Sequence, residues 1–67
     1  MNEAMEHIEE QLNELKRLKK MPDKILARAV LNGMCTAYIR MGKITNAQLD
    51  EVKRRAERYT EVTAKDF

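Results

Sequence analysis

A turn-forming stretch around Gly42 constrains the fold of this chain more than any other part of its sequence. Gly42 can adopt the left-handed conformation that ends a helix, because it has no Cβ atom. Thr45 and Gln48 have the spacing of a capping box at the start of the next helix. Ile44 and Leu49, which flank that cap, have the spacing of a hydrophobic staple. The stretch therefore predicts two helices joined by a short turn.

The spacing of apolar residues predicts three helices, over residues 2–20, 23–41 and 46–62. Pro22 is expected to end the first helix, because the residue before a proline is pushed away from helical geometry. Apolar side chains of the first helix follow a 4-3-4-3 spacing, which places them on one stripe. This stripe consists of Met1, Met5, Ile8, Leu12 and Leu15.

The second helix has a wide apolar surface. At 100° per residue, its apolar side chains cover about half of the circumference, more than one neighbouring helix can cover. They are Leu26, Ala27, Val30, Leu31, Met34, Cys35, Ala37, Tyr38 and Met41. Gly33 weakens the helix and also permits close approach of another helix.

The third helix has a narrower inner stripe and a charged outer surface. The stripe consists of Leu49, Val52, Ala56 and Tyr59. On the outer surface, Asp50 and Arg54, and likewise Glu51 and Arg55, have the spacing of helix-stabilising ion pairs.

The length of the chain points to association. A domain of 67 residues buries only about 60% of its unfolded surface, so its own core is marginal. The single cysteine excludes an intramolecular disulfide, and one cysteine with one histidine does not make a zinc site. We therefore expect a single all-α domain over residues 1–67 that forms an intertwined helical homodimer. The expected dimer core is Met5, Ile8, Leu12, Leu15, Leu26, Val30, Met34 and Tyr38.

Several function classes have no support in the sequence. No apolar run approaches the roughly 18 residues that cross a membrane, and no glycine-rich phosphate loop is present. A nucleophilic Cys35 would need a neighbouring base, and the only histidine, His7, belongs to another helix. We therefore expect no catalytic residues, no cofactor and no metal. The lone thiol and the missing signal peptide indicate a cytoplasmic protein.

Charge is distributed unevenly along the chain, although the net charge is only +2. Residues 1–15 contain five glutamates and no Lys or Arg, whereas residues 16–28 contain six basic residues and one Asp. Two copies of the first helix lying antiparallel would bring these opposite charges together, which favours a homodimer.

Residues 38–52 resemble the helix–GxIT–helix hairpins of small accessory proteins from the early regions of temperate bacteriophages. The matching positions are Gly42, Ile44, Thr45 and Leu49. The resemblance implies a connection between helices and, for a phage-encoded protein, a location in the bacterial host cytoplasm. It implies no enzymatic activity.

Three functions remain open, of which the third is a purely structural assembly subunit. The first is a regulator or adaptor that binds a host protein, which the five methionines favour because Met suits adaptable interfaces. The second is a small dimeric nucleic-acid-binding regulator, although glutamates interrupt the cations of the third helix. The possible contacts to a partner protein or to nucleic acid are Lys16, Lys20, Arg28, Arg40, Arg54 and Arg58.

Overall fold

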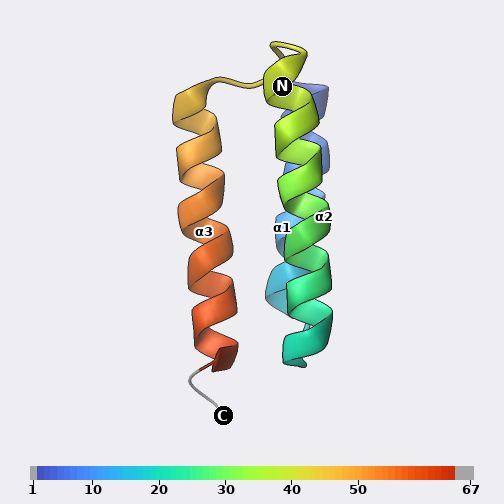
Figure 1. The fold of residues 1–67 in the computed structure, drawn as a ribbon, viewed down its shortest axis with the longest axis vertical. Helices are drawn as coiled ribbons and strands as arrows, with labels where there is room; N and C mark the ends of the chain where they lie inside the picture. Colours follow the sequence, from blue (N-terminus) through green and yellow to red (C-terminus); the bar gives the residue numbers. More distant parts are fainter. Residues whose placement is uncertain (1, 65–67) are drawn as a thin grey trace.

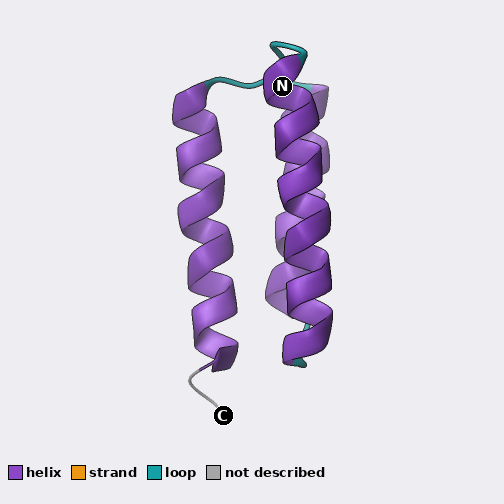
Figure 2. Cartoon of the chain, in the orientation of Figure 1, coloured by secondary structure: helices purple, strands orange, loops and turns teal. Residues whose placement is uncertain are grey.

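The computed structural model describes the backbone of residues 2–64 and the side chains of residues 2–60. Within that range the chain is all-helical, with α1 (Glu3–Arg17), α2 (Met21–Arg40) and α3 (Asn46–Ala64) and no strand (Figure 2). The helices alternate in direction, so that α1 and α3 run the same way and α2 runs opposite to both (Figure 1). Met1, which the spacing places in the first stripe, lies outside the described residues.

The three helices pack against one another pairwise and form an elongated bundle of 38 × 19 × 17 Å. Among residues 2–60, ten apolar residues are buried in the core: Ala4, Ile8, Leu12, Leu15, Ala27, Leu31, Cys35, Ile44, Val52 and Ala56. All three helices contribute to this core, so one chain builds it without a second copy. The predicted three-helix architecture is confirmed.

The connection between α1 and α2 differs from the prediction. We expected the first helix to extend to residue 20 and Pro22 to end it, but α1 ends at Arg17. Pro22 lies inside the first turn of α2 instead. In that turn a backbone N–H has no partner within the helix, so the N–H that proline lacks is not missed, and the fixed φ of proline is favourable. The proline therefore starts the second helix and does not end the first.

The connection between α2 and α3 confirms the predicted turn. Gly42 has a positive φ of 70°, and the Lys43 N–H donates to the carbonyl of Tyr38 at 2.9 Å, as in a Schellman motif. The Thr45 N–H donates to Gln48 Oε1 at 2.8 Å, and the Gln48 N–H donates to Thr45 Oγ1 at 3.1 Å, which completes the capping box. This hydrogen bonding fixes where α2 ends and α3 begins.

The start of α1 is held to the same turn. The Asn2 side chain accepts a hydrogen bond from the Ala4 N–H at 2.8 Å and so caps α1. Its amide nitrogen also donates to the carbonyl of Lys43. One side chain therefore connects the beginning of the bundle to the α2–α3 turn, 41 residues later.

Candidate protein-interaction surfaces

One face of α2 carries large apolar side chains that no other helix covers. Leu26 is 68% exposed, Val30 47% and Met41 58%. Gly33 and Ala37 are also exposed. These five residues, called the α2 stripe below, fall within about 80° of arc at 100° per residue. The expectation that α2 is more apolar than its neighbours can cover is confirmed.

The first helix does not have such a free face. Ile8, Leu12 and Leu15 are 0% exposed, because they pack between α2 and α3 of the same chain. Met5 is half-buried against the same core. We expected these four residues to lie in a dimer core, but they form the core of one chain and the buried three have no exposed area to offer a second copy.

The other expected interface residues, all on α2, divide into two groups. Met34 and Tyr38 are half-buried against the core, whereas Leu26 and Val30 point away from it. Among the side chains that the structure describes, the large exposed apolar ones therefore all belong to α2 and its C-cap. Ile25, which is 60% exposed, lies at the edge of this surface and was not among the residues predicted from the sequence.

The basic residues do not form one continuous surface. Lys16, Lys20 and Arg58 are exposed at the end of the bundle where α1 ends and α2 begins, and Lys16 Nζ lies 5.8 Å from the centre of the Tyr59 ring. Arg40 is at the opposite end, because the 20 residues of α2 span about 30 Å. The cations predicted as contacts are therefore divided between the two ends and the middle of the bundle.

Two other predicted contact residues, Arg54 and Arg28, have neighbours that make them less available to a ligand. Arg54 pairs with Glu51 at 2.6 Å on the surface of α3, and not with Asp50 as the spacing predicted. Arg28 is half-buried beside the groove between α2 and α3.

Lys24 belongs to the core and not to the basic cluster in which its position in the sequence places it. It is only 2% exposed, and its Nζ donates to the carbonyl oxygen of Leu15 at 2.7 Å. That carbonyl is one of the last four of α1, which have no partner within the helix. Burial lowers the pKa of Lys24, because desolvation disfavours the charged ammonium. Lys24 therefore caps α1 and is not available to a ligand.

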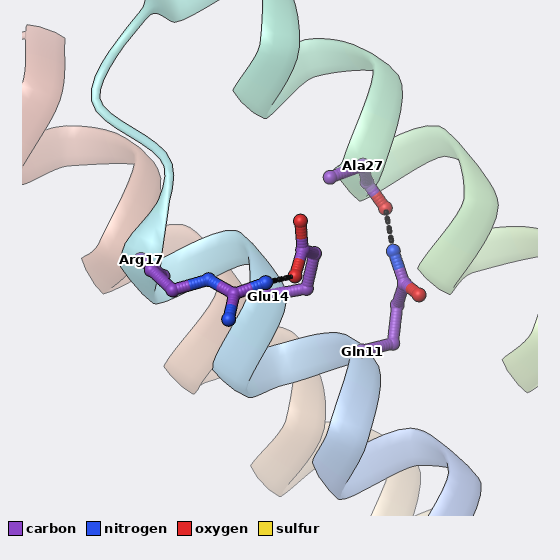
Figure 3. Close-up of polar contacts among 4 residues, drawn as sticks. All are labelled: Gln11, Glu14, Arg17 and Ala27. Carbon is purple, nitrogen blue, oxygen red and sulfur yellow. Dashed lines mark hydrogen bonds and ion pairs between the residues drawn. The ribbon is translucent and has the colours of Figure 1, made fainter.

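A second side chain connects α1 and α2 further along the helices. The side-chain amide of Gln11 donates to the carbonyl of Ala27 at 3.2 Å (Figure 3). In the same view, Glu14 and Arg17 form an ion pair one turn apart on the exposed side of α1. Gln11 therefore fixes the contact between the two helices, whereas the Glu14–Arg17 pair is local to α1.

An ion pair joins α1 to α3. Arg55 donates to both carboxylate oxygens of Glu9, at 2.5 and 3.0 Å. We predicted that Arg55 pairs with Glu51 on its own helix, and this was wrong. The hydrogen bonds from Arg55 hold the pKa of Glu9 below its ordinary value, and those to Glu9 raise the pKa of Arg55. A bidentate pair of this kind fixes the orientation of the two helices.

A groove of about 420 Å³ lies between α2 and α3. Cys35, Ile39 and Leu49 provide its apolar lining, and its charged residues are Arg28, Lys53 and Glu57, two positive and one negative. Burial raises the pKa of the Cys35 thiol, so the thiol stays protonated and is a poor nucleophile. The groove is on the side of α2 opposite to the α2 stripe, because Ile39 lies about 180° from Val30 on the helix.

His7 lies in another part of the bundle. Its Nδ1 is hydrogen-bonded to the Tyr38 hydroxyl at 2.7 Å, which connects α1 to α2. The structure thus does not bring His7 into the groove that contains Cys35. In the described part of the chain, no three Cys, His, Asp or Glu residues gather as a metal site. Among the helices described, none combines the length and the apolar character needed to cross a membrane.

The α2 stripe had a recognisable signal in the sequence. Its residues, Leu26, Val30, Gly33, Ala37 and Met41, recur at spacings of three and four positions, which place them on one side of a helix. Comparisons with family models, curated proteins and solved structures found no match to this chain.

Proposed function

We propose that this protein is a non-enzymatic regulator or adaptor, which acts by binding another protein and forms a helical homodimer. For a phage-encoded chain, the bound protein would be a protein of the bacterial host. The observation that carries the proposal is the α2 stripe. Burying a side chain such as Leu26 or Val30 contributes about 1.5–3 kcal/mol, so a continuous stripe is a strong site for association.

The chemistry of the other residues supports a binding role more than a catalytic one. The buried thiol of Cys35 lines the α2–α3 groove, whereas His7 bonds to Tyr38 between α1 and α2. A cysteine nucleophile needs a base within hydrogen-bond reach. Three ionisable groups with shifted pKa values, Glu9, Arg55 and Lys24, have partners within the bundle, and burial accounts for the shift of Cys35.

Sedimentation equilibrium tests the homodimer. At low micromolar concentration we expect about twice the chain mass of 7.9 kDa. Val30→Glu should give the mass of one chain, because it places a charge in the middle of the α2 stripe. Asn32→Glu is the matched control, since Asn32 is also exposed on α2 but points to the other side. A single-chain mass for the unsubstituted protein would contradict the dimer.

The α2–α3 groove is the surface we propose for the partner protein. Its apolar lining and its excess of positive charge, Arg28 and Lys53 against Glu57, suit an apolar segment that also carries a carboxylate. The groove lies opposite to the α2 stripe, so a dimer would leave it open.

Affinity purification from the source organism tests this second surface. A bound protein should be captured by the unsubstituted chain, lost with Lys53→Glu, and retained with Lys43→Glu, which changes a lysine outside the groove. Equal capture by both variants would show that the groove is not the binding surface.

A further inference from the structure

The α2 stripe is asymmetric along its length. Its N-terminal half contains the large residues Leu26 and Val30, the following part contains the small residues Gly33 and Ala37, and the large Met41 lies at its C-terminal end. Gly33 has no role in packing within the chain, because a Cβ atom built there meets nothing within 4 Å. A glycine in the middle of a helix weakens it. The presence of Gly33 on the exposed face of α2 therefore indicates that another molecule approaches this helix closely.

We infer that this molecule is a second copy of the chain. The α2 stripes of the two copies lie antiparallel, with Leu26 over Ala37 and Val30 over Gly33 of the second copy. The inference rests on the proposed homodimer and specifies its interface. In this register Leu26 and Val30 each meet a small residue, as close helix packing requires, and Met41 faces Pro22. A parallel pair would instead place large residues against large ones and small against small.

The charges beside the α2 stripe favour the same arrangement. Asp23 and Arg40 are both exposed, and they flank the stripe near the two ends of α2. Within one chain they lie 17 positions apart, about 25 Å along the helix, so they cannot pair with each other. The register that places Val30 over Gly33 places Asp23 beside Arg40 of the second copy, twice in each dimer. A parallel pair would bring like charges together.

Disulfide trapping tests the direction and the register. In a Cys35→Ala background, a mixture of Leu26→Cys and Ala37→Cys chains should form a cross-linked heterodimer. Leu26→Cys alone should not cross-link, because the two copies of residue 26 would lie about 16 Å apart along the antiparallel helices. A disulfide needs Cα atoms within about 7 Å. Cross-linking of Leu26→Cys with itself, or no cross-linking in a dimer of normal mass, would overturn the inference.

Two further sets of variants examine shape and charge separately. Gly33→Leu should abolish the dimer while each chain still folds, whereas Asn32→Leu, which adds a similar side chain off the stripe, should not. Arg40→Glu should weaken the dimer about three- to tenfold, and Asp23→Lys combined with Arg40→Glu should restore it. No effect of Gly33→Leu, or no restoration by the double variant, would contradict the register.

These outcomes separate the inference from the proposed function. A single-chain mass for the unsubstituted protein refutes the homodimer itself. A dimer that forms but shows the wrong cross-link refutes only the antiparallel register.

Discussion

Lys24 Nζ lies 2.7 Å from the carbonyl oxygen of Leu15, which is nine residues earlier and on the preceding helix. The aliphatic part of this lysine is buried in the core, while its ammonium meets the negative end of the α1 dipole. A charged residue thus stabilises the end of a helix that has no glycine cap.

Replacing Lys24 with Met should therefore destabilise the chain. The methionine keeps most of the apolar packing but leaves the Leu15 carbonyl without its donor, at a cost of about 1–3 kcal/mol. The urea midpoint measures this loss. Lys20→Met is the control, because Lys20 is exposed and should change stability by less than about 0.5 kcal/mol. Equal midpoints for the two variants would show that the buried lysine contributes nothing as a cap.

The Glu9–Arg55 pair makes stability depend on pH in the acid range. Because the pKa of Glu9 is lowered in the folded chain, the unfolded chain binds its proton first as the pH falls below about 4.5. The stability that the pair contributes is therefore fully present above that pH and is lost as the pH falls through the lowered pKa. We expect it to stay below about 1 kcal/mol, because Glu9 is partly solvated.

Urea unfolding at pH 7 and at pH 3 measures this effect. Glu9→Gln should be less stable than the unsubstituted chain at pH 7, and the difference should shrink at pH 3. Glu10→Gln, a change at the neighbouring exposed position, should show no such dependence. A difference that stays constant with pH would contradict the role of the ion pair.

Gly42→Val should destabilise the chain through its backbone. The φ of 70° is unfavourable for a β-branched residue by about 1–2 kcal/mol, although a Cβ atom would meet nothing within 4 Å. Gly42→Asn should cost less, because Asn tolerates this conformation better. Thermal unfolding followed by circular dichroism would rank the variants. A Gly42→Val chain as stable as the Asn variant would show that the turn does not require a left-handed residue.

Binding to nucleic acid should be weak and without sequence preference. Lys16 and Lys20 lie near the end of α1 and the start of α2, Arg40 lies at the other end of α2, and Lys24 is buried in the core. Few of them can contact one phosphate backbone together, so binding should disappear near 150 mM salt, roughly the physiological level. Fluorescence anisotropy with a specific and a scrambled duplex tests this expectation. Sub-micromolar affinity for one sequence at that salt concentration would favour the alternative function.

The sequence was most informative about structural features that depend on residues close together in the chain. The turn from Gly42 to Gln48 uses hydrogen bonds between positions a few residues apart, so its pattern is local and the prediction is confirmed. The apolar stripe of α1 was also recognised, but periodicity shows only which side of a helix is apolar. It does not show what covers that side, and Leu12 is covered by its own chain.

The contacts missed were those that depend on packing in three dimensions. Lys24 is one of the six basic residues counted over residues 16–28, and the sequence does not reveal that its aliphatic chain crosses the core. Arg55 has an acidic residue four positions earlier, yet it pairs with Glu9, 46 residues away. Both cases involve long side chains, which reach several possible partners until the positions of the helices are fixed.

The connections of the bundle have a consequence for how it folds. Residues 18–20 and 41–45 are short links, so α1–α2 and α2–α3 can each form early as hairpins. Only the contact between α1 and α3 joins residues that are far apart in the chain. Topologies in which most contacts are local fold within microseconds to milliseconds. We therefore expect Arg55 to meet Glu9 late, after the folding barrier has been crossed. Removing that pair should speed unfolding and leave the refolding rate nearly unchanged.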